Sequence, residues 1–198
     1  MLYYMGMGRA RIEIPTFFAG HLLVAMPTMS DSRFERTVIY MCAHNPDGAM
    51  GLVINKPFEQ LTFPDLLEQL NIDTGPRTKQ IRLRAGGPVE AGRGFVLHSD
   101  DYMHDGSMRV MPGIALTATV DILKALAAGS GPRKSLLALG CAGWSAGQLE
   151  SEIQRNGWLT VPASEELVFA PDLDSIWERA LGEAGIDVSF LSGEAGHA

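Results

Sequence analysis

Apolar residues are concentrated in short continuous runs, and Gly, Pro, Asn or Asp stand between these runs. Runs bounded in this way predict strands, some of them buried on both faces. Asn45-Pro46-Asp47-Gly48 lies between two of the runs and has strong turn chemistry, which predicts a β-hairpin. The strands are expected at residues 17–26, 37–44, 50–55, 81–84, 94–98, 110–116 with a break at Pro112, 135–141, 158–161 and 167–170.

Capping residues and apolar positions at helical spacing predict four helices. Thr62 and Asp65 have the spacing of a capping box, in which the first side chain accepts an early backbone N–H. Ser145 and Gln148 repeat this spacing, so Ser145 is interpreted as a helix N-cap. The helices are expected directly after Thr62, from Thr119 to Ala128 before Gly129, from Ser145 to Arg155, and from Asp172 to Gly185.

The order of these elements favours one compact domain, because the chain has no internal repeat, no low-complexity tract and no long linker. Strands outnumber helices and include a hairpin. A mixed α+β fold with a largely antiparallel sheet therefore fits better than a strictly parallel, doubly wound one.

Charge and composition narrow the function classes. The 198 residues include 16 Lys and Arg and 23 Asp and Glu, so the net charge of −7 argues against a nucleic-acid partner. The short basic segment 77–84 is interpreted as a solvated strand face. No export signal is visible and no apolar run is long enough to span a bilayer, so we expect a cytoplasmic protein without membrane contact. Cys42 and Cys141 are expected to be reduced core thiols.

The sharpest catalytic signal is G-x-S-x-G at residues 143–147, between an apolar strand and a helix, which is the setting of a nucleophile elbow. Asp172, Asp174 or Asp187 followed by His197 gives the chain order of a triad. His197 is the penultimate residue, and few residues follow Ser145, so a helix cap explains the same serine more simply.

Metal and cofactor signals are weaker. Cys42 and His44 share one face of a strand, and His98, Asp100, Asp101, His104 and Asp105 form a His/Asp cluster. Neither spacing matches a metal motif, so no metal is expected. The glycine-rich turns match neither a P-loop nor a dinucleotide fingerprint, so no cofactor is expected.

Four blocks carry a family resemblance: GHLLVAMPTMSDSRFERTVIYMCAHNPDGAMGLVINKP, GGPVEAGRGFVLHS, ALGCAGWSAGQLESEIQRNGWLTVPA and the closing LSGEAGHA. In this order they resemble the signature blocks of the bacterial AlgH/YqgE family. The resemblance covers residues 17–198 as a single domain and leaves residues 1–16 as an N-terminal extension. It implies a largely antiparallel sheet that curls into a pseudo-barrel with helices packed outside. It brings no established reaction, and it weakens the nucleophile hypothesis because the family accepts Gly at the position of Ser145.

A cytoplasmic binding or regulatory module, acting on an unknown protein partner or small ligand, is the leading functional hypothesis. The alternative is a small serine hydrolase that uses Ser145, and a third is the transcriptional regulator that the AlgH name suggests. Polar residues embedded in apolar blocks are the candidate binding surface: Asn55, Lys56, Gly87, Arg93, Trp144, Gln148 and Glu150.

Overall fold

A computed structural model describes residues 17–76 and 78–188 of the chain. Its nine strands form one sheet in the order β6-β7-β5-β8-β3-β2-β1-β9, and the short β4 pairs with β8 beside this path. The strands are β1 (His21–Ala25), β2 (Val38–Asn45), β3 (Gly48–Val53), β4 (Leu83–Ala85), β5 (Val89–Ser99), β6 (Ser107–Met111), β7 (Ile114–Thr117), β8 (Ser135–Ser145) and β9 (Trp158–Pro162).

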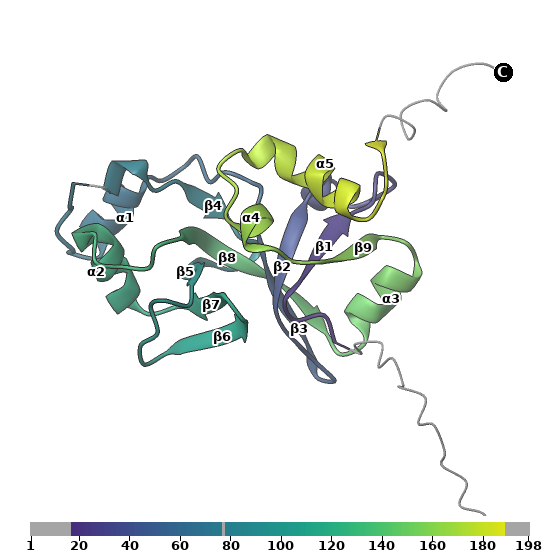
Figure 1. Cartoon of the computed structure of the whole chain (residues 1–198), viewed down its shortest axis with the longest axis horizontal. Helices are drawn as coiled ribbons and strands as arrows, with labels where there is room; N and C mark the ends of the chain where they lie inside the picture. The colour runs from purple at the N-terminus through teal and green to yellow at the C-terminus, as the bar shows by residue number, and fades with distance from the viewer. Residues whose placement is uncertain (1–16, 77, 189–198) are drawn as a thin grey trace, which may run out of the picture.

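The sheet is antiparallel throughout the main path, and only β4 runs parallel to its neighbour β8. It curls into a half-barrel with the helices packed against it, as Figure 1 shows. The predicted fold class is therefore confirmed, and so is the β2–β3 hairpin with its turn at Pro46 and Asp47.

Both faces of β1, of most of β2 and of β7 are buried, which explains why these strands read as continuous apolar runs. In β1, Leu22 and Val24 point to one side of the sheet, where they pack in one core with Trp177. Leu23 and Ala25 face the opposite side and pack in a second core with Trp158. Alternate residues of one strand therefore serve two different cores.

The helices are α1 (Phe63–Gln69), α2 (Val120–Ala128), α3 (Gln148–Gln154), α4 (Glu165–Val168) and α5 (Leu173–Glu183). In Figure 1, α1 and α2 lie together at one end of the molecule, α3 lies at the other, and α4 and α5 lie along one side. The Thr62–Asp65 capping box is present, and Gly129 ends α2 in the left-handed conformation with φ of 74°. No helix in the described parts of the chain is long and apolar enough to span a membrane.

β8 is held by close backbone contacts at Gly140. Its first half pairs with β4 and β5, and its second half pairs with β3. Gly140 has φ of 73°, and a Cβ added there would lie 2.3 Å from the carbonyl oxygen of Gly87. The Gly86 N–H also donates to the carbonyl of Leu139 over 2.8 Å. Only glycine permits this crossing, so the glycine-rich segments have a structural role.

The break expected at Pro112 within residues 110–116 is present, because Pro112 and Gly113 form a turn between β6 and β7. Two other local predictions were wrong. Residues 167–170 are not a strand, because Ser164 caps the short helix α4 by accepting the Leu167 N–H. Arg84 is not on a solvated face: it is buried and donates to two main-chain carbonyls, and burial lowers its pKa to about 10.

Candidate functional site

A cleft of about 490 Å³ opens where β8 ends, α3 begins and β9 starts. We call it the tryptophan cleft, because the side chains of Trp144 and Trp158 line it. The loop before β2, which contains the 3-10 helix Ser32–Phe34, forms the facing wall. The lining residues are Thr28, Met29, Ser30, Asp31, Arg33, Phe34, Pro88, Ala142, Gly143, Trp144, Gln148, Glu152, Arg155, Asn156, Gly157 and Trp158.

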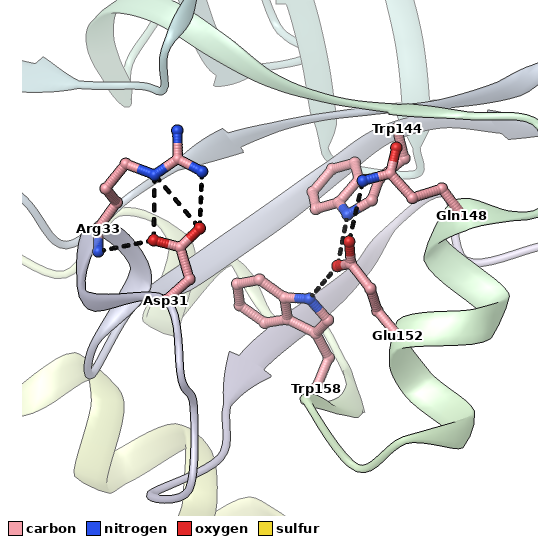
Figure 2. A network of polar contacts seen from close by, with 6 residues as sticks. All are labelled: Asp31, Arg33, Trp144, Gln148, Glu152 and Trp158. Atoms are coloured by element: carbon pink, nitrogen blue, oxygen red, sulfur yellow. Dashed lines mark hydrogen bonds and ion pairs between the residues drawn. The ribbon is translucent and has the colours of Figure 1, made fainter.

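The carboxylate of Glu152 is the centre of a polar network in this cleft (Figure 2). The indole N–H of Trp144 donates to Glu152 Oε2 over 2.9 Å, and that of Trp158 donates to the same oxygen over 2.8 Å. Gln148 Nε2 donates to Glu152 Oε1 over 2.9 Å. All three partners are donors, which suits a carboxylate that can only accept.

Helix α3 places the network by its periodicity. Gln148 and Glu152 are one turn apart and therefore lie on the same side of the helix. Leu149 and Ile153 point instead to the core beneath the sheet, where they pack with Trp144 and Trp158. The two indoles meet edge to face with centroids 6.3 Å apart. Helix packing thus fixes the position of the Glu152 side chain in the cleft.

Gln148 has a fixed amide orientation. Its Oε1 accepts the backbone N–H of Ser145 over 3.1 Å and the Ser145 hydroxyl over 3.2 Å. Because the backbone N–H can only donate, Nε2 of Gln148 must face Glu152. The network therefore runs from the end of β8 through Gln148 to Glu152.

The facing wall contains an ion pair. Arg33 donates through Nε and Nη2 to the carboxylate of Asp31, with the shortest distance 2.7 Å, and Figure 2 shows this pair opposite the Glu152 network. The side-chain hydrogen bonds from Arg33 hold the pKa of Asp31 below its usual range. Asp31 also caps the 3-10 helix by accepting the Arg33 backbone N–H. The two charges of this wall therefore neutralise each other.

Ser145 does not have the surroundings of a nucleophile. Its hydroxyl hydrogen bonds to the amide oxygen of Gln148, which is not a general base. Asp172 and Asp174 lie at the start of α5, and His197 lies outside the described residues. The N-cap of α3 is Gly147, with φ of 74°, so the prediction that Ser145 is the N-cap was wrong.

Four of the seven candidate surface residues line two adjoining cavities, and the other three lie elsewhere. Trp144 and Gln148 line the tryptophan cleft, whereas Lys56 and Gly87 line an adjoining pocket of about 190 Å³. The two cavities share Arg33, Phe34 and Pro88 in their walls. Four of the seven residues therefore lie along one continuous part of the surface.

The other three candidates have separate structural contacts. Asn55 is buried, accepts the Val38 N–H over 2.9 Å and donates to the carbonyl of Arg36 over 2.8 Å, so it connects two segments of main chain. Arg93 is exposed and lies 3.3 Å from the Glu90 carboxylate. None of these three residues lines either cavity.

Glu150, the third of them, contacts a histidine on the other side of α3. His44 accepts the backbone N–H of Phe18 at Nδ1, over 3.1 Å, so its Nε2–H faces Glu150 Oε1 over 2.9 Å. A hydrogen bond from its own backbone N–H, and then the bond from His44, hold the pKa of Glu150 below its usual range. Phe18 stacks on the His44 ring. The His44–Glu150 pair therefore belongs to the packing between β2, α3 and Phe18.

The proposed metal and thiol clusters are not assembled. Among the described residues, no group of three or more His, Cys, Asp or Glu side chains could hold a metal ion. His98 is fully buried and hydrogen bonds to Ser99 and Thr117 within the sheet. Cys42 and Cys141 are both free and buried, and burial raises the pKa of each thiol.

Sequence reasoning missed Asp31, Arg33, Glu152 and Trp158 as cleft residues. Glu152 could have been found, because it lies one helical turn after Gln148 and both are polar. The others come from segments that only the folded sheet brings together.

The chain is similar to known proteins over nearly its whole length. A family model described as AlgH-like matches residues 22–189. A UPF0301 protein of Cereibacter sphaeroides is 57% identical over 181 residues, which cover 91% of this chain and 98% of that protein. A UPF0301 protein of Afipia carboxidovorans is 54% identical over 194 residues, which cover 92% of this chain and 91% of that protein.

Solved structures agree with this assignment. The solution structure of AlgH from Pseudomonas aeruginosa has a TM-score of 0.78 and 41% identity, and the match covers 98% of this chain and 100% of that one. A crystal structure of a protein from Corynebacterium diphtheriae is 20% identical and has a TM-score of 0.67. The match covers 82% of this chain and 84% of that one, and it supports the fold alone. The resemblance inferred from the sequence blocks is confirmed, and the chain belongs to the AlgH-like family.

Proposed function

We propose that this protein is a cytoplasmic binding module that holds a small ligand, or a side chain of a partner protein, in the tryptophan cleft without transforming it. One observation carries the proposal: a concave site with two aromatic walls surrounds a carboxylate that three side chains hold in place. Concave sites with aromatic walls and a few fixed polar groups are typical of ligand binding. Preorganised groups bind more tightly, because less conformational freedom is lost on association.

A binding role fits the chemistry better than hydrolysis does. A hydrolase needs a nucleophile within hydrogen-bond reach of a base. Ser145, which supplies the G-x-S-x-G pattern, bonds instead to the Gln148 amide. A regulatory role, if the protein has one, would then follow from occupancy of the cleft rather than from catalysis.

The test is native mass spectrometry of the full chain purified gently from its own cells, compared with the mass after denaturation. We expect a retained ligand in the wild type. Gln148→Ala should lose it, because the Gln148 side chain fixes Glu152 in the cleft. Lys124→Ala is the matched control, because Lys124 is an exposed residue of α2 that does not line the cleft.

A bare wild-type chain would be followed by a thermal-shift screen of metabolites and peptides. The proposal fails if no compound raises the melting temperature of the wild type, or if Gln148→Ala responds as strongly as the wild type does. A ligand that binds the folded state and not the unfolded state raises stability, so any ligand included in the screen at saturating concentration must raise the melting temperature.

A further inference from the structure

We propose that the ligand of the tryptophan cleft carries a positive charge, as an alkylammonium or a guanidinium group, and that this group binds the carboxylate of Glu152. The inference rests on the proposed binding function and names the chemical class of the ligand. The same group could belong to a free amine or to a Lys or Arg side chain of a partner.

The first argument is the charge of Glu152. Among the residues that the structure describes, no Lys, Arg or His nitrogen forms an ion pair with this carboxylate. Its three partners are the two indole N–H groups and the Gln148 amide, which are all neutral. The hydrogen bonds position the charge but do not neutralise it, so a cation from outside would be attracted.

The second argument is the hydrogen-bonding capacity that remains. An ionised carboxylate has about four lone-pair positions. Oε2 of Glu152 already accepts from both indoles, whereas Oε1 accepts only from Gln148. One acceptor position on Oε1 is therefore left for a ligand N–H. Glu152 is partly exposed and lines the cleft, so this position can be reached.

The other charges of the cleft do not replace a ligand cation. Arg33 is engaged by Asp31 through three hydrogen bonds, so this pair has no net charge. Arg155 also lines the cleft, but it is exposed and forms no ion pair with Glu152. The solvent around an exposed guanidinium screens its charge.

The lining of the cleft fits the same class of ligand. Trp144 and Trp158 point their indole N–H edges at one oxygen of the carboxylate, and Phe34 adds a third ring to the lining. Aromatic and apolar groups in the lining can cover the alkyl stem of a ligand while its cationic head reaches the carboxylate. A carboxylate in such a lining therefore favours an amine with an apolar stem over an anion.

The test observes the cleft through its own tryptophans. The chain has three Trp residues, so the indole region of a ¹H–¹⁵N spectrum of the full protein contains three signals. Trp144 and Trp158 report on the cleft. Trp177 is an internal control, because its N–H is buried and donates to the carbonyl of Ala25. Trp→Phe variants assign the signals.

The probes are n-pentylammonium and n-butylguanidinium, with 1-pentanol as the neutral analogue and pentanoate as the anionic one. We expect the two cations to shift the Trp144 and Trp158 signals in a saturable way while the Trp177 signal stays in place. The neutral and anionic analogues should bind on the order of tenfold more weakly. The four probes are compared on the wild-type protein, so the result does not require that any variant fold correctly.

Glu152→Gln then tests the assigned partner. It removes the charge and retains the side-chain shape, so cations should lose their advantage over 1-pentanol. Glu183→Gln makes the same charge change at an exposed position of α5 outside the cleft, and it should bind the cations as the wild type does. An unshifted Trp177 signal in both variants verifies that the fold is intact.

Three results would overturn the inference. If 1-pentanol or pentanoate binds as tightly as the cations, the charge assignment is wrong while the binding function stands. If all three indole signals move together, the binding is not in the cleft. If no probe moves any signal, the cation inference fails, and the ligand screen above decides the binding function separately. A lysine tripeptide with blocked termini distinguishes the two sources of the cation. If it binds more tightly than n-pentylammonium, the natural ligand is a side chain of a partner protein; if it binds more weakly, the natural ligand is a free amine.

Discussion

The close crossing at Gly140 predicts a large loss of stability on adding a single methyl group. In Gly140→Ala the new Cβ would lie 2.3 Å from the Gly87 carbonyl oxygen, whereas an ordinary contact begins at 3.4 Å. The two segments must therefore separate by about 1 Å. One hydrogen bond joins the same two segments and depends on their closeness: the Gly86 N–H donates to the carbonyl of Leu139 over 2.8 Å.

The magnitude follows from a matched control, Gly129→Ala. Gly129 has φ of 74°, nearly the same as the 73° of Gly140, but its added Cβ would meet nothing within 4 Å. The control therefore isolates the cost of the left-handed backbone, about 1 kcal/mol. To this cost of about 1 kcal/mol, Gly140→Ala adds about 1 kcal/mol for the one weakened hydrogen bond and about 1–3 kcal/mol of overpacking. The expected total is roughly 3–5 kcal/mol.

The assay is equilibrium unfolding in urea, followed by tryptophan fluorescence, with the free energy of unfolding extrapolated to water. Equal destabilisation of the two variants would refute the reasoning, because backbone conformation alone would then explain both glycines. The two variants count as equally destabilised if their free energies of unfolding differ by less than about 1 kcal/mol, given the error of the extrapolation.

Three further predictions concern side chains. A fluorophosphonate probe should leave Ser145 unmodified, and a stoichiometric adduct detected by mass spectrometry would revive the hydrolase alternative. Cys42 and Cys141 should resist a thiol reagent at neutral pH until denaturant is added, because burial raises the pKa of both thiols; fast labelling of the native protein would contradict this. Glu150→Gln should be less stable than the wild type above pH about 4.5. Since the folded protein holds the pKa of Glu150 below its usual value, this deficit should vanish as the pH falls through the lowered pKa, and a deficit that persists in acid would contradict the role of the charge at the His44 contact.

The parts of the fold that local chemistry specifies were predictable from the sequence. The β2–β3 turn, the capping box at Thr62 and the end of α2 at Gly129 each depend on residues next to one another in the chain. The run at 167–170 was ambiguous, because four apolar residues suit a strand or one turn of helix equally. The cap at Ser164 decides in favour of the helix.

The candidate site was predictable only where it is local. Trp144 and Gln148 stand out because they interrupt an apolar block, and both line the cleft. Asp31 and Trp158 are far apart in the sequence and meet because β1 pairs with β9. No periodicity or turn chemistry encodes that pairing, so the part of the cleft formed by Asp31 and Trp158 could not be predicted before the topology was known.

The same β1–β9 pairing determines when the cleft can exist during synthesis. Leu22 pairs with Val161, 139 positions later in the chain. At about 5–20 residues per second, a ribosome needs on the order of 10 s to make the intervening segment. Throughout that time one edge of β1 has no strand partner, and the wall formed by Trp158 has not been made. A nascent chain therefore gains the tryptophan cleft only after β9 has been synthesised, and it is during this interval that β1 is most exposed to wrong pairing.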